Sequence, residues 1–321
     1  MIREGNKITI IGAGTIGSTV AYTLMLKGLA REIILINRTE GRARVKALDL
    51  AHCRTCTTET DIRSGDFEDS FNSDIVIIAG GALPRKDGTR MDVLENNINM
   101  YKDIIPKLVK YSPESVIIVV TNPVDIMAYV AYKLSGFPHS RIIGSGTLLD
   151  TLRFKYILSE RFGIEASKIQ AEIIGEHGDS MVPVWSRTRY LGTDLQQYLS
   201  TRKLILDYKG REEILEETKR AGWNIRLGNE HSCYAISSSI VKIIENILSF
   251  AEDMLPISTL LTGEYDIKKV FLSLPSFLHK KGVSEIGIIN LDNEELKQLA
   301  QSAKVLTEYI READSLLMHK L

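Results

Sequence analysis

The segment Lys7-Ile-Thr-Ile-Ile-Gly12-Ala-Gly14-Thr-Ile-Gly17 runs from a short apolar stretch directly into a glycine-rich turn. In a G-x-G-x-x-G turn the first glycine permits a tight bend, the second lets the backbone approach a pyrophosphate, and the third lets helix and strand pack closely. The helix that follows would offer free N–H groups and its positive dipole end to that pyrophosphate. The preceding strand and the position near the start of the chain favour a dinucleotide-binding unit over an ordinary turn.

The first half of the chain alternates short apolar runs with amphipathic segments, of which Met91–Lys110 has the clearest helical period. The expected strands are Ile8–Ile11, Ile33–Ile36, Asp61–Arg63, Ile75–Ala79, Val116–Val120 and Ile142–Ile143. Continuous β-branched strands that alternate with helices predict a parallel sheet covered on both faces. We therefore expect an α/β fold, with a Rossmann doubly wound parallel sheet as a dinucleotide-binding domain over residues 1–145.

The second half mixes helical and strand-like patterns, and it predicts an α+β substrate and catalytic domain over residues 146–321. The expected helices are Leu148–Arg161, Glu212–Leu227, Ala235–Leu248 and a segment from Asn293 to the C-terminus. The expected strands are Ile169–Ile174, Leu260–Leu261, Val270–Leu274 and Ile286–Ile289.

The charge balance argues against two classes of partner. The 40 basic and 41 acidic side chains leave a net charge of −1, which gives no field to attract nucleic acid or an anionic membrane. The apolar runs are too short to cross a bilayer, and the first strand begins so early that we expect no signal peptide. Three cysteines cannot all pair internally, so we expect a reducing compartment, the cytoplasm.

The residue at the end of the second expected strand bears on cofactor choice. An acidic residue is usual there, about 20 residues after the glycine turn, because it binds the adenine ribose hydroxyls. This chain has Asn37 followed by Arg38. An asparagine does not repel a 2′-phosphate, and a guanidinium can bind one bidentately. We expect NAD, and NADP use stays open; Arg38 as a solvated loop residue is the alternative.

Three segments supply the groups that hydride transfer to a 2-oxo acid requires: a proton donor, a group that orients it, and cations for the carboxylate and carbonyl. His177 follows an apolar strand, and its side chain titrates near neutrality. Asp150 and Arg153 share one face of a helix. Arg90 ends a polar, glycine-containing loop that could close over a substrate. A surface ion pair is the alternative for Asp150 and Arg153.

Several motifs together resemble the L-lactate/L-malate dehydrogenase family. They are GAGTIG (Gly12–Gly17), TNPVD (Thr121–Asp125), GFP (Gly136–Pro138), GSGTLLDTLRF (Gly144–Phe154) and IIGEHGDSMVPVWS (Ile173–Ser186). They span nearly the whole chain in the order of the family. The resemblance implies a small-molecule substrate and a homo-oligomer, either a dimer or a homotetramer.

The resemblance also implies residue roles. His177 would be the proton donor and acceptor, Asp150 its orienting partner, and Arg153 the carboxylate ligand. Arg90 would polarise the carbonyl, and Asn122 would contact substrate and cofactor. Further candidates are Ser232 for the substrate and Gly12, Gly14, Ile16, Gly17, Gly81, Ala82, Val120 and Ser145 for the cofactor.

The substrate is less clearly indicated. By resemblance to the family, the residue six positions before the loop arginine would select the substrate. Glutamine there suits lactate, and arginine suits a dicarboxylate, because a second buried carboxylate needs a counter-charge. That count gives Pro84, and an alignment shifted by one gives Arg85. The GEHGDS and VPVWS segments resemble lactate enzymes, whereas the length around residues 228–235 resembles malate enzymes. We expect L-lactate/pyruvate and glycolysis, with L-malate/oxaloacetate or a bulkier 2-hydroxy acid as alternatives.

Some features point away from other functions. Lys155 and Gln170 replace the arginine and histidine typical of relatives that respond to fructose 1,6-bisphosphate, so we doubt such activation. Cys53 and Cys56 form a C-x-x-C without the second pair of a zinc site, and we expect no metal. An NAD-dependent glycoside hydrolase and a non-catalytic cofactor-binding protein are the competing classes. Loss of absorbance at 340 nm with 2-oxo acids would distinguish them.

Overall fold

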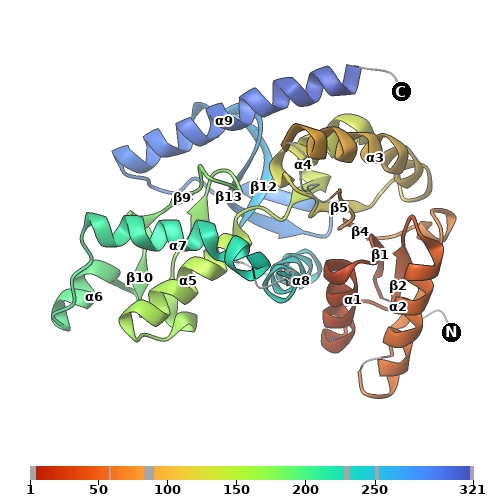
Figure 1. Ribbon diagram of the computed structural model, residues 1–321, viewed down its shortest axis with the longest axis horizontal. Helices are drawn as coiled ribbons and strands as arrows, with labels where there is room; N and C mark the ends of the chain where they lie inside the picture. Colours follow the sequence, from red (N-terminus) through yellow and green to blue (C-terminus); the bar gives the residue numbers. More distant parts are fainter. Residues whose placement is uncertain (1–4, 58, 83–89, 228–231, 250–252, 319–321) are drawn as a thin grey trace.

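A single nine-stranded sheet runs through the molecule in the order β14-β13-β12-β6-β5-β4-β1-β2-β3 (Figure 1). The computed structural model describes residues 5–57, 59–82, 90–227, 232–249 and 253–318. Six strands are parallel: β1 (Lys7–Ile11), β2 (Glu32–Ile36), β3 (Asp61–Ser64), β4 (Ile75–Ile78), β5 (Val116–Val119) and β6 (Ile142–Gly144). Each of the six expected strands of the first half is therefore confirmed.

Alternate residues of these strands point into two different cores. Ile8, Ile10, Ile33 and Leu35 pack with α1 (Thr15–Lys27), α2 (Glu40–His52) and α8 (Tyr234–Ser249). The residues between them pack on the opposite face with α3 (Arg90–Tyr111), α4 (Val124–Ser135) and α9 (Asn293–Met318). Burial on both faces explains why central strands such as β4 and β5 are continuously apolar. The Rossmann-type sheet predicted from the sequence is confirmed.

The second half extends the same sheet with antiparallel strands. These are β12 (Leu255–Thr262), β13 (Lys268–His279) and β14 (Gly282–Ile286), and β12 joins β6 by pairing Ser258 with Gly144. Two small sheets stand apart, formed by β7 (Ile169–Gln170), β10 (Arg189–Tyr190) and β11 (Thr193–Asp194), and by β8 (Ile173–Ile174) and β9 (Val182–Pro183). The remaining helices are α5 (Leu148–Phe162), α6 (Leu195–Thr201) and α7 (Tyr208–Leu227).

Two strand predictions in this half were wrong in part. The expected strand Ile169–Ile174 is divided into β7 and β8, which belong to different sheets. The expected strand Ile286–Ile289 lies instead at Gly282–Ile286, where the register with β13 shifts between Phe277 and Leu278. The apolar residues after it are not on the ladder, and Ile288 is 65% exposed. In both places pairing with neighbouring segments, and not hydrophobicity, determines the strand.

Candidate active site

The glycine turn at the end of β1 has the close backbone approaches that its sequence predicts. A Cβ on Gly12, whose φ is +107°, would lie 2.4 Å from the nitrogen of Gly80, and a Cβ on Gly17 would lie 2.0 Å from the carbonyl oxygen of Gly12. A Cβ on Gly14 would meet no atom within 4 Å. The backbone of Gly14, at the N-cap of α1, therefore faces open space next to free helix N–H groups. This arrangement fits a dinucleotide pyrophosphate.

Asn37 lies beside this turn, at the end of β2. Its Oδ1 accepts a hydrogen bond from the backbone N–H of Ala13 at 3.2 Å, and its Nδ2 donates to the carbonyl of Thr39 at 3.1 Å. The asparagine thus fixes the turn as well as standing where a ribose contact is expected. Arg38 is exposed next to it.

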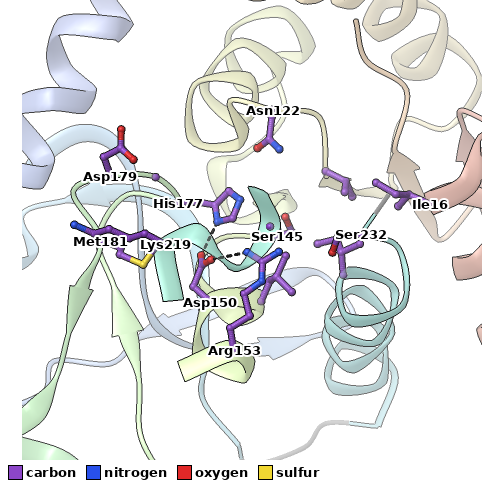
Figure 2. Close-up of a pocket in the computed structure, with 15 residues that line it drawn as sticks. Ile16, Asn122, Ser145, Asp150, Arg153, His177, Asp179, Met181, Lys219 and Ser232 are labelled. Carbon is purple, nitrogen blue, oxygen red and sulfur yellow. Dashed lines mark hydrogen bonds and ion pairs between the residues drawn. The ribbon is translucent and has the colours of Figure 1, made fainter. Parts of the chain in front are cut away.

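A pocket of about 330 Å³ opens between the two halves of the chain (Figure 2). Its lining includes residues expected to contact cofactor or substrate: Ile16, Val120, Asn122, Ser145 and Ser232. It also includes the residues expected to carry out the chemistry: Asp150, Arg153 and His177. Since the sheet order reverses direction around β1, the pocket lies where doubly wound sheets bind their ligands.

The carboxylate of Asp150 contacts both His177 and Arg153. Asp150 Oδ2 lies 2.5 Å from Nδ1 of His177, and Asp150 Oδ1 accepts from Nη1 of Arg153 at 3.3 Å. Asp150 is 1% exposed, whereas the side chains of His177 and Arg153 retain 19% and 14%. The structure therefore brings the three groups together, with the histidine and arginine accessible from the pocket.

The surroundings of His177 favour its charged form. Burial alone would lower the pKa of the imidazole, but the charge and hydrogen bond of Asp150, together with the charge of Asp125, outweigh burial and the opposing charge of Arg153. The net result is a pKa above the ordinary 6.5. A histidine held in this way can carry a proton near neutral pH and release it to a nearby oxygen.

Three elements hold the backbone that carries this imidazole. The N–H of Gly175 donates to the carbonyl of Ser273 in β13, and the N–H of Glu176 donates to Ser302 Oγ in α9. The N–H of His177 donates to Asp125 Oδ2 in α4 at 2.9 Å. The ring is thus fixed through its backbone as well as through Nδ1.

Sequence reasoning missed two buried residues that support the site. Asn97, on the buried face of α3, accepts from the N–H of Ala82 at 2.7 Å and donates to the carbonyl of Asn122 at 2.8 Å. Asp125 was quoted only as part of TNPVD. A polar residue inside an otherwise apolar helical stripe was the available signal for Asn97.

Sequence reasoning also missed part of the pocket wall. Asp179, Met181, Lys219 and Gly222 line the pocket (Figure 2 labels the first three). A Cβ on Gly222 would lie 3.0 Å from Nη2 of Arg153, so α7 passes directly against the guanidinium. Asp179 and Met181 lie in the quoted segment Ile173–Ser186, without a role assigned to them. No local pattern pointed to Lys219 and Gly222, because they reach the site only through the packing of α7 on α5.

The remaining predicted residues lie in or around the loop that follows β4. Gly81 and Ala82 are the last described residues before it, and a Cβ on Gly81 would lie 3.0 Å from the methyl group of Thr121. Arg85 lies outside the described residues, as does the side chain of Arg90, whose backbone begins α3.

The two positions that bear on sugar-phosphate activation lie elsewhere. Lys155 is on α5, where it interacts electrostatically with Glu172, and Gln170 is exposed on β7.

No group of three or more histidine, cysteine or acidic side chains among the described residues is arranged to hold a metal ion. No helix in the described segments is both long and apolar enough to cross a membrane.

A Rossmann-type sheet with an open glycine turn, next to a pocket with a buried acid–histidine pair and an accessible arginine, defines a dinucleotide-dependent dehydrogenase. Comparison with known proteins identifies its family. Residues 6–144 match the NAD binding domain of lactate/malate dehydrogenases, and residues 147–316 match their alpha/beta C-terminal domain. The chain belongs to the lactate/malate dehydrogenase family and is an NAD-dependent oxidoreductase.

Individual relatives match this chain over nearly its full length. The chain is 42% identical to an L-lactate dehydrogenase of Clostridium perfringens, over 98% of this chain and 99% of the relative. It is 40% identical to L-lactate dehydrogenase 1 of Clostridium acetobutylicum, over 96% and 98%. The crystal structure of the minor L-lactate dehydrogenase from Enterococcus mundtii, in a ligand-bound form, superposes with a TM-score of 0.92 at 28% identity, covering 96% of this chain and 98% of that one.

Proposed function

We propose that this protein interconverts pyruvate and L-lactate, with His177 as the group that moves the proton. The observation that carries the proposal is the single Asp150 carboxylate, which joins His177 and Arg153 at the wall of a pocket whose other side is the dinucleotide domain. The names of the relatives favour lactate over the alternatives.

Each group then has a defined task. Arg153 binds the substrate carboxylate, because a guanidinium matches its two oxygens. Asp150 holds Nδ1–H of His177, which leaves Nε2 to donate its proton to the carbonyl oxygen during reduction. Bound NADH supplies the hydride that C2 of the substrate receives. Arg90 is assigned to polarising the carbonyl on family resemblance.

The glycine turn and its neighbours are proposed to hold the cofactor. Gly12, Gly14 and Gly17 shape the pyrophosphate site, and Asn37 stands at the ribose. Ile16, Gly81, Ala82, Val120, Asn122 and Ser145 complete the proposed contacts, with Ser232 on the substrate side. We keep the boundary between the two domains at residues 145 and 146.

We further propose a homo-oligomeric, cytoplasmic enzyme. Exposed apolar side chains on α1 and α2 support self-association: Tyr22, Leu26, Val45 and Leu48. All three cysteines are free, as is usual in a reducing compartment.

The test is to compare His177→Gln with wild type in the reduction of pyruvate, oxaloacetate and branched 2-oxo acids, followed at 340 nm. Loss of the proton donor should lower kcat by roughly 10³-fold, while NADH binding, measured by fluorescence, persists. His139→Gln, at an exposed histidine, is the matched control and should retain activity. Full turnover by His177→Gln would refute the assignment.

The same panel of 2-oxo acids tests the alternative that the enzyme acts on the dicarboxylate oxaloacetate. If Arg85 selects a dicarboxylate, Arg85→Gln should reduce oxaloacetate turnover and spare pyruvate. Unchanged oxaloacetate turnover would exclude Arg85 as a selector.

A further inference from the structure

Asp125 lies directly behind the backbone of His177, in the first turn of α4. It is 2% exposed, and its Oδ2 accepts the His177 N–H at 2.9 Å. The carboxylate therefore contacts the same residue as Asp150 does, but from the backbone side. His177 is held between two buried acids, one at its ring nitrogen and one at its amide.

The second carboxylate oxygen of Asp125, Oδ1, is buried next to the charged and polar groups that set its protonation state. Asp125 Oδ1 and Ser258 Oγ in β12 are both buried, and among the described residues neither atom has a hydrogen-bond partner of normal geometry. The Ser258 hydroxyl and the His177 amide favour the ionised carboxylate, as does the charge of His177, whereas burial and the charge of Glu176 oppose it. These groups come from β12 and from the segment after β8.

We propose that Asp125 is a positioning residue for the proton-transfer step: its carboxylate fixes the backbone of His177, and its negative charge stabilises the imidazolium form. This inference rests on the proposed role of His177 as proton donor. Asp150 selects the ring tautomer and orientation, and Asp125 adds charge and a backbone anchor without touching the ring. The two acids therefore have separable effects.

The pH dependence of kcat/KM distinguishes the effect of Asp125 from that of Asp150. Reduction requires the imidazolium, so kcat/KM for pyruvate falls as pH rises through the pKa of His177. Removing a negative charge close to the imidazole lowers that pKa, and the falling limb should move to lower pH by roughly one unit. In lactate oxidation, which requires the neutral imidazole, the rising limb should move in the same direction.

The experiment uses Asp125→Asn, which keeps an oxygen that can accept the His177 N–H but removes the charge. We expect its kcat on the plateau to fall less than about tenfold, whereas Asp150→Asn should lose about 10³-fold or more because the ring loses its orienting acceptor. Ser302→Ala is the matched control: it removes the hydroxyl that anchors Glu176 N–H in the same segment without changing charge. The falling limb of the pH profile of Ser302→Ala should stay at the wild-type pH.

Circular dichroism and NADH fluorescence establish that each variant is folded. An unshifted limb in a folded Asp125→Asn protein would overturn the proposal, as would an equal shift in Ser302→Ala. If Asp125→Asn does not fold, Ser258→Ala replaces it, because loss of the hydroxyl disfavours ionised Asp125 and should shift the limb the same way by a smaller amount. No shift in Ser258→Ala would then overturn the proposal. Full activity in His177→Gln would instead refute the proposed function.

Discussion

Asp125 carries a charge in surroundings that disfavour it. Burial raises its pKa from 3.8 to about 6, so the folded protein binds this proton more tightly than the unfolded chain does. The stabilisation from that proton is full below pH 3.8 and is lost as pH rises through 6. At neutral pH the ionised carboxylate therefore costs up to about 3 kcal/mol.

Asp125→Asn should consequently stabilise the fold at pH 8 and not in acid. We expect its gain in the free energy of unfolding to approach about 3 kcal/mol above pH 7 and to shrink toward pH 4.5, measured by urea denaturation across that range. Asp103→Asn, at a 65% exposed side chain, is the control and should not gain stability at pH 8. A destabilised Asp125→Asn at pH 8 would contradict this account. A gain of the expected size would instead show that Asp125 is a stability cost retained for catalysis.

Arg38 tests cofactor choice at the level of one side chain. If its guanidinium pairs with a 2′-phosphate, Arg38→Ala should lower kcat/KM for NADPH by about tenfold or more and leave NADH unaffected. Arg42→Ala, at an exposed arginine of α2, controls for loss of general positive charge. A wild-type preference for NADH greater than tenfold would already exclude meaningful NADP use.

At the scale of elements, α7 limits where the guanidinium of Arg153 can lie. A methyl group on Gly222 would come within 3.0 Å of Nη2, so the arginine would have to shift by a few tenths of an ångström. Gly222→Ala should therefore raise KM for pyruvate by roughly tenfold, with a smaller effect on kcat and no change in NADH affinity. Asn224→Ala, at an exposed position of the same helix, should behave as wild type in steady-state kinetics. An unaltered KM in Gly222→Ala would show that the arginine has room to adjust.

The elements also show what the sequence could predict. Most of the parallel strands could be predicted because burial on both faces makes them nearly continuously apolar, a signal contained within the strand itself. The edge strand β3 is the exception, since Ile62 is its one buried residue. The division of Ile169–Ile174 into β7 and β8 depends on partners outside the segment, at Arg189–Tyr190 and Val182–Pro183. Short strands of this kind carry no local signal.

The same reasoning applies to the site. His177, Asp150 and Arg153 were predicted because residue chemistry and family motifs agree on them. Asp125 and Gly222 were missed because each acts on a residue distant in sequence, Asp125 on a backbone amide 52 positions away and Gly222 on Arg153. Such contacts arise from packing and cannot be read from spacing.

At the scale of the whole molecule, α1 and α2 carry apolar side chains that the described part of the chain leaves exposed. Tyr22 and Leu26 on α1 are 41% and 51% exposed, and Val45 and Leu48 on α2 are 66% and 59% exposed. The two helices cover the same face of the sheet at one end of the molecule (Figure 1). Exposed apolar side chains of this size are typical of an interface between subunits when they form one patch.

If a second copy covers this surface, charge placed there should separate the subunits. Leu48→Lys should lower the mass measured by analytical ultracentrifugation, because a lysine buried in an apolar interface would lack a partner. Ile205→Lys changes a side chain that is 83% exposed in the segment between α6 and α7, and it should leave the mass unchanged. A wild-type monomer at micromolar concentration, or an undisturbed oligomer in Leu48→Lys, would refute association through this surface.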